Sequence, residues 1–146
     1  MALVVGTNSW ATLVEADLYL TDRIHAEVWF TLLDTPANPG EESKESYLIS
    51  AFYWLSGSPQ LEIPASSTAA NVKIAQIEGA FFLQEHYEAL NERRAAIATG
   101  LDSFRYSKRM ENLSASDLKI PDYILGMLGE FGTMNTTAIL LGEYDL

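Results

Sequence analysis

The chain of 146 residues contains no cysteine, which excludes disulfide bonds, thiolate zinc sites and thiol nucleophiles together. It also contains no apolar run close to the ~20 residues that a membrane-spanning helix needs. Its first residues lack the basic region and the long apolar core of a secretory signal, so we expect no signal peptide. Cysteine usage fits a reducing compartment, and nothing in the sequence points to a membrane.

Basic residues are scarce, because nine Lys and Arg stand against twenty Asp and Glu, for a net charge of −11. A surface that wraps duplex nucleic acid needs clustered cations to displace counterions, so this charge argues against a DNA-binding module. It is compatible with solubility alone, or with a wall past which DNA slides without sticking, since like charge repels phosphate.

Motifs of the common enzyme classes are also missing. The sequence has no G-x-S-x-G, no P-loop and no G-x-G-x-x-G. Its two histidines, His25 and His86, fall on different predicted helices and form no metalloprotease signature. Carboxylate pairs such as Glu41 and Glu45 lie on polar faces, where nothing would raise the pKa of a general acid. We therefore expect a protein that is not an enzyme and has no catalytic residue, cofactor or metal.

What the sequence does contain is helical patterning in a globular composition, with 48% hydrophobic and 20% charged residues. We expect a mainly α fold, a small helical bundle of four to five helices with an extended arm or hairpin and an extended C-terminal tail. Residues 1–132 form one domain, with the arm at about 101–112, and residues 133–146 form a C-terminal docking tail.

Two helices are predicted in the first half of the chain. Thr12 and Glu15 form a capping box that opens the first helix. This helix is expected to turn Ala16, Tyr19, Leu20 and Ile24 inward. Glu41, Glu42 and Glu45 are expected in the first turns of the second helix, where its dipole favours anions. Its predicted core face is Tyr47, Leu48, Ala51, Phe52 and Leu55, and it ends at Ser56–Pro59.

A long helix from about residue 71 to residue 94 is predicted to be apolar on two opposite faces. One stripe is an ordinary core face with Val72, Ala75, Gly79, Leu83 and Leu90, beside Phe82. The nearly opposite side carries Ile74, Ile77 and Phe81, which we predict to lie in a subunit interface. Glu78, Glu85 and Glu92 are predicted to form a solvated outer edge. A helix with two apolar faces needs two partners, which favours a subunit of an assembly.

Five of the nine basic residues lie between positions 93 and 109, which we call the basic segment: Arg93, Arg94, Arg105, Lys108 and Arg109. Phe104 and Tyr106 are interleaved with them, on an expected strand or hairpin at 101–110. Such a pattern fits stacking on single-stranded nucleic acid. It also fits a charge-complementary interface with an acidic partner, including another copy of this chain. We favour the interface, with Arg105, Tyr106, Lys108 and Arg109 as its members.

The C-terminal region combines a short amphipathic helix with an apolar end. Pro121 stands where proline starts helices, and Gly132 ends the pattern. Ala138–Leu141 is apolar and uncharged, so this chain end is expected to need a cover. The residues predicted to dock onto a partner or a neighbouring copy are Tyr123, Met127, Phe131, Ile139, Leu140 and Leu141.

The order of these segments resembles the head–tail connector, or adaptor, proteins of tailed bacteriophages. The resemblance rests on Ser9–Tyr19, Lys44–Ala51, Leu61–Pro64, Val72–Gln76 and the start of a final helix at Ile120–Pro121. It covers roughly residues 8 to 131. Related phage sequences have also been described as DnaT-like single-stranded-DNA-binding proteins.

The resemblance implies a structural protein of the virion, located at the head–tail interface and in the host cytoplasm during assembly. Family members form a ring, commonly of twelve copies, beneath the portal. The implied partners are other copies of the chain, the portal protein and a tail or head-closure protein. DNA would pass through the channel without sequence-specific binding. The alternative is a phage single-stranded-DNA-binding or replication accessory protein.

Overall fold

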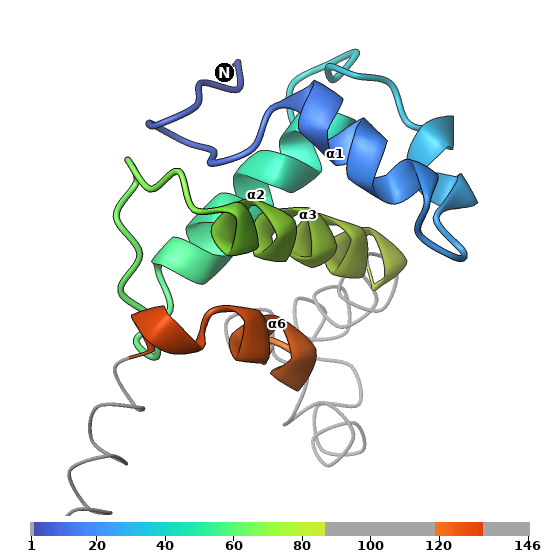
Figure 1. Cartoon of the computed structure of the whole chain (residues 1–146). Coiled ribbons are helices and arrows are strands. Elements are labelled where there is room, and N and C mark those ends of the chain that lie inside the picture. The colour runs from blue at the N-terminus through green and yellow to red at the C-terminus, as the bar shows by residue number, and fades with distance from the viewer. Residues whose placement is uncertain (1, 87–118, 133–146) are drawn as a thin grey trace, which may run out of the picture.

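The computed structural model describes residues 2–86 and 119–132, which form a small bundle of helices (Figure 1). The α-helices are α1 (Leu13–Thr21), α2 (Lys44–Ser56), α3 (Ala70–Glu85) and α6 (Asp122–Met127), and the 3₁₀ helices are η1 (Glu27–Thr31) and η2 (Gly129–Phe131). No strand occurs in these two ranges, and the predicted mainly α fold is confirmed. The expected arm at 101–112 and the tail at 133–146 lie outside the described residues.

Helix α3 is the centre of the bundle. It packs most extensively against α2, and also contacts α1 and α6. In Figure 1, α3 runs across the middle, with α1 above it and α6 below it. Every other described α-helix therefore uses α3 as its support.

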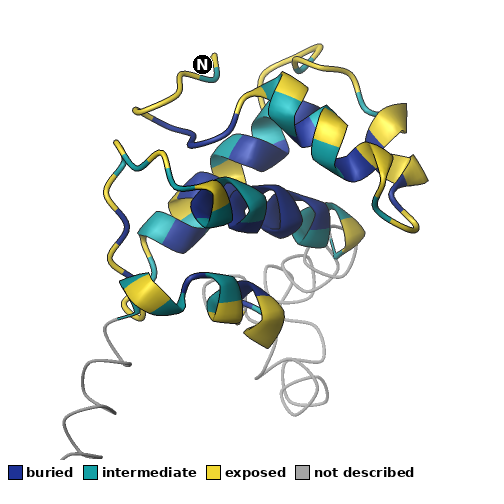
Figure 2. Cartoon of the chain, viewed as in Figure 1, coloured by how far each residue is buried: buried dark blue, intermediate teal, exposed yellow. Residues whose placement is uncertain are grey.

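The core divides into two clusters along α3. The first joins α1, η1, the start of α2 and the last turns of α3, and comprises Ala11, Ala16, Leu20, Ala26, Trp29, Tyr47, Leu48, Ala51, Ile77, Ala80 and Phe81. The second joins the end of α2, the start of α3 and α6, and comprises Trp10, Phe52, Leu55, Leu61, Ile63, Val72, Ala75, Ile120, Ile124 and Leu128. The dark blue stretches of Figure 2 trace these buried positions along α2 and α3.

The first two helices begin as their capping residues dictate. The Glu15 backbone N–H donates to Thr12 Oγ1 at 3.1 Å, and the Thr12 N–H donates to Glu15 Oε1 at 2.9 Å, so the capping box is confirmed. Ser43 caps α2 by accepting from the Ser46 N–H at 3.0 Å. Because α2 starts at Lys44, only Glu45 lies in its first turn, and the prediction that placed Glu41 and Glu42 there is wrong.

The rest of α2 agrees with the pattern in its sequence. All five predicted core residues of this helix are buried, and the helix ends at Ser56 with Gly57 as its C-cap. The helical spacing of large apolar residues was sufficient to predict this core face, because α2 packs a single broad face against α3.

The second apolar face of α3 is not left for another subunit. Ile77 and Phe81 are 2% and 1% exposed, and both belong to the first core cluster of the chain itself. The segments that cover them are α1 and η1, which pack across the helix where the sequence pattern left room for a partner chain. The predicted subunit interface is therefore wrong for these two residues, while Ile74 is partly buried.

Two further predictions fail around α1. Helix α1 ends at Thr21, and His25 follows with a φ of 67°, so the helical spacing stops before Ile24. Ile24 is 73% exposed instead of turned inward. Glu78 is buried and not solvated, because side chains of α1 and the turn after it bind its carboxylate. Glu85 is exposed as predicted, and Leu90 and Glu92 lie outside the described residues.

Candidate interaction surface

The predicted docking residues near the C-terminus lie on α6 and η2. Ile124 and Leu128 are buried in the second cluster, while Met127 and Phe131 pack partly against it. Tyr123 is about half exposed, and it lies close to Glu78 and Arg23, so burial and then the charge of Glu78 raise the pKa of its hydroxyl. The other predicted contact residues lie outside the described ranges, namely Arg105, Tyr106, Lys108, Arg109, Ile139, Leu140 and Leu141.

A buried glutamine on α3 holds three parts of the chain together. The Trp10 and Ala11 backbone N–H groups both donate to Gln76 Oε1 at 2.9 Å. Gln76 Nε2 donates to Ser9 Oγ and to the Leu48 carbonyl, both at 2.8 Å. The amide thus uses both of its donors and accepts two bonds, fully screened from solvent. It fixes the segment before α1 against α2 and α3, and so sets where α1 lies.

A second polar cluster joins α1 to α3 near the end of the bundle. Glu78 Oε2 accepts from the Tyr19 hydroxyl at 2.6 Å and from Arg23 Nε at 3.0 Å, and Glu78 Oε1 accepts from Arg23 Nη2 at 3.3 Å. The guanidinium also lies 5.2 Å from the centre of the Phe81 ring. A buried carboxylate is tolerable here because a fork-shaped cation and a hydroxyl satisfy both of its oxygens.

The pKa of Tyr19 gives this cluster a testable pH dependence. Burial, and then the hydrogen bond to Glu78, raise the pKa of the Tyr19 hydroxyl from 10.0 to about 12. A raised pKa in the folded state means that the contribution of Tyr19 to stability is complete below pH 10 and is lost as the pH rises to about 12. In an ultraviolet absorbance titration, Tyr19→Phe is expected to remove one tyrosine that ionises near pH 12. Loss of one that ionises near pH 10 would contradict the buried contact.

A third polar cluster ties η1 and the following loop to α1. Lys44 Nζ lies 3.1 Å from Asp17 Oδ1 and 3.5 Å from Asp34 Oδ1, and 5.2 Å from the centre of the Phe30 ring. The Trp29 indole N–H donates to Asp17 Oδ1 at 2.9 Å. Because one ammonium contacts residues before, within and after η1, these segments lie side by side at one end of the molecule.

Helix α1, η1 and the residues that follow them expose many large apolar side chains. We define the α1–η1 surface by six large apolar residues, which are Val14, Leu18, Ile24, Val28, Phe30 and Leu33. Val14 and Leu18 are each 67% exposed and lie one turn apart on the outer side of α1. Figure 2 shows the corresponding exposed stretches on α1 and on the 3₁₀ helix beside it. Six such residues within twenty positions form a concentration that single scattered surface residues do not give.

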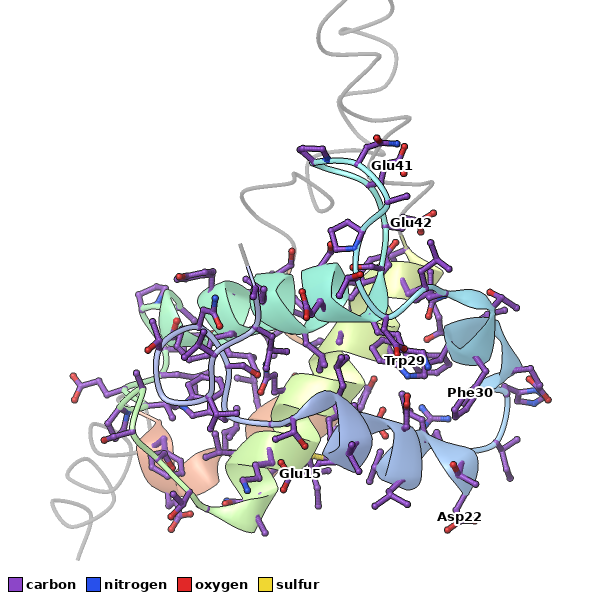
Figure 3. All side chains as sticks on the ribbon, turned by 90° about the horizontal axis from the view of Figure 1, so that it is seen from above. Glu15, Asp22, Trp29, Phe30, Glu41 and Glu42 are labelled. Carbon is purple, nitrogen blue, oxygen red and sulfur yellow. The ribbon has the colours of Figure 1, made fainter. Side chains whose placement is uncertain are left out.

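The same surface is strongly acidic. Residues 14–42 contain seven Asp and Glu and one basic residue, Arg23, which is bound to Glu78. Lysines from outside this range offset three of the seven, because Lys73 pairs with Glu15 and Lys44 pairs with Asp17 and Asp34. Seen from above in Figure 3, Asp22 and Phe30 lie at one end of the molecule, and Glu41 and Glu42 stand on the loop that projects before α2. The surface therefore offers apolar contact area within a negative field, which suits a basic and aromatic ligand.

Within residues 2–86 and 119–132, no group of three or more His, Asp and Glu side chains is placed to hold a metal ion. None of the helices in those ranges has the length and apolar character to cross a bilayer.

Comparisons of the chain with protein-family models, curated proteins and solved structures found no significant match. The features of this chain that bear on function are therefore its sequence pattern, the α1–η1 surface and the polar clusters that support that surface.

Proposed function

We propose that this protein is a structural adaptor of a tailed bacteriophage, which forms a ring beneath the portal and joins it to the tail. The observation that carries the proposal is the α1–η1 surface, where a folded chain with a well-filled core still exposes six large apolar side chains. The resemblance over residues 8 to 131 suggests the assembly in which such a surface would be buried, which is a ring of copies beneath the portal.

Charge supports a ring over a two-fold dimer. The α1–η1 surface is acidic, whereas the basic segment at 93–109 has five cations and one acidic residue. A contact between two different patches is heterologous, and repeating it generates a closed ring when the rotation between copies allows closure. Many copies multiply a weak contact, so no single interface in the ring must be strong.

The overall charge also suits a channel protein. At −11 per copy, a ring of such chains would surround DNA with negative potential and repel its phosphates. A duplex could then slide through without being held, which is what genome passage from head to tail requires.

Location in the virion tests this proposal. Gold-labelled antibody against the chain is expected to mark purified tailed particles at the vertex between head and tail, with about one site per particle. Antibody against a major capsid protein is the control and should label the whole head. Protein that is abundant in the infected-cell lysate but missing from washed particles would contradict the adaptor.

Single-stranded-DNA binding is the second candidate function, favoured by the interleaved cations and aromatic rings of the basic segment. It requires salt-dependent micromolar binding to labelled oligonucleotides that is lost in Arg105→Ala/Lys108→Ala/Arg109→Ala. Lys119→Ala, at an exposed lysine in the described part of the chain, is the control. Absence of binding at low salt eliminates this function.

A further inference from the structure

We infer that the α1–η1 surface is the docking site for the basic segment of a second copy of this chain. The inference rests on the proposed adaptor assembly and names the surface through which neighbouring copies meet. The juxtaposition that carries it is a row of exposed apolar side chains beside unpaired carboxylates, in a chain whose cations are concentrated elsewhere.

Contacts with the folded core fix the position of the apolar part of this surface. Lys44 fixes Phe30 and Asp34 beside Asp17, and the Gln84 side chain donates to the Val28 carbonyl at 2.9 Å. The Trp29 ring, next to Phe30, is buried in the first cluster. The surface is therefore largely preformed, and binding of a partner costs little conformational entropy on this side of the contact.

The carboxylates divide into paired and unpaired groups. Glu15 is paired with Lys73, and Asp17 and Asp34 share Lys44. Among the described residues, Asp22 and Glu27 have no basic partner, and both are exposed at the two sides of the turn after α1. These two side chains are free to pair with cations from outside the folded chain.

The sequence contains one segment that matches this surface. In the basic segment, Arg105, Lys108 and Arg109 alternate with Phe104 and Tyr106. Cations beside aromatic rings complement carboxylates beside apolar side chains, whereas the rest of this acidic chain would be repelled. Among residues 2–86 and 119–132, none covers Val14 and Leu18. We assign their cover to the basic segment of another copy.

Charge reversal on each side, followed by mixing, tests the docking. The surface variant is Asp22→Lys/Glu27→Lys, and the segment variant is Arg105→Glu/Lys108→Glu/Arg109→Glu. Glu62→Lys/Asp122→Lys is the matched control for the surface variant, since both replace two exposed carboxylates by lysine, here on the α6 side. Sedimentation velocity over a range of protein and salt concentrations measures association in each case.

We expect the wild type and the control to associate equally, more weakly as salt rises, and each reversed variant to associate about tenfold or more weakly. An equimolar mixture of the two reversed variants is expected to recover association, because each supplies what the other lacks. Leu18→Gln, a neutral change on the exposed side of α1, is expected to weaken association without altering the melting temperature. It keeps the test valid if a charge reversal impairs folding.

Several results would overturn the inference. Association that is unchanged in the surface variant would place the contact elsewhere while leaving the ring itself intact. A chain that stays monomeric at all concentrations, but becomes less compact in the segment variant, would mean that the segment covers its own chain. Loss of oligonucleotide binding in the segment variant, with unchanged association, would assign the segment to nucleic acid. Failure of the adaptor itself is seen separately, as absence of the protein from washed particles.

Discussion

Gln76→Leu is expected to lower the free energy of unfolding by about 3–5 kcal/mol. Leucine has a similar volume but forms none of the four hydrogen bonds of the buried amide. The Trp10 and Ala11 N–H groups would lose their partner inside the core, and each unsatisfied group costs about 1–3 kcal/mol. The Leu48 carbonyl would keep its helical donor within α2. For a chain of this size the melting temperature should fall by roughly 10–15 °C.

Gln84→Leu is the matched control for this experiment. Gln84 lies on the same helix two turns later, donates one hydrogen bond to the Val28 carbonyl, and has a buried Oε1 without a partner among the described residues. Replacing it removes one exposed hydrogen bond and one unpaired acceptor, so stability should change by less than about 1 kcal/mol. Equal effects of the two substitutions in urea unfolding would mean that the Gln76 network does not hold the N-terminal segment in place.

Phe81→Ala is expected to cost about 3–4 kcal/mol of stability, because it empties a fully buried aromatic site in the first core cluster. The cavity would lie beneath α1 and η1, and the Arg23 guanidinium would lose the ring it lies over. Urea unfolding measures the loss in the monomer, at a concentration below any association.

Val14→Ala is the control, since Val14 is 67% exposed on the outer side of α1. It should change monomer stability by less than about 0.5 kcal/mol. The opposite pattern, with a stable Phe81→Ala monomer that no longer associates, would restore Phe81 to a subunit interface and contradict its place in the core.

Local signals were enough to predict the parts of this fold that depend on neighbouring residues in the chain. The Thr12–Glu15 capping box involves one turn of backbone, and its residues determine it completely. The core face of α2 follows from 3.6-residue periodicity, because one continuous helix packs one face on one partner. The start of a short helix at Pro121 was also predicted, because proline favours the beginning of a helix. The structure shows that Ile124 and Leu128 are buried there.

Contacts between segments that are far apart in the sequence could not be predicted. Ile77 and Phe81 formed a second apolar face as predicted, but the spacing does not say which segment covers it. The cover includes η1, a 3₁₀ helix of five residues that places only Trp29 in the core and has no α-helical periodicity to detect.

The prediction that Glu78 is exposed to solvent was wrong for the same reason. Its partners, Tyr19 and Arg23, are 59 and 55 positions away in the sequence, so its position beside Glu85 on a helix face suggested solvent. A buried charge of this kind is recognised only when the fold brings a cation to it.

The α1–η1 surface was missed because Ile24 was assigned to the inner side of α1. Val14 and Leu18, spaced by four residues on the side opposite Ala16 and Leu20, were the available signal. The chain does expose a large apolar area, as the sequence predicted, but this area is not on the long central helix α3. It is on α1 and η1, the elements that cover that helix.

Electron cryomicroscopy of the assembled protein would show whether neighbouring copies meet through the α1–η1 surface. We expect a closed ring in which this surface of each copy, with Val14, Leu18 and Phe30, is covered by the basic segment of the next copy. A ring in which these side chains remain open to solvent, or a particle that holds the chain as a single copy, would contradict it.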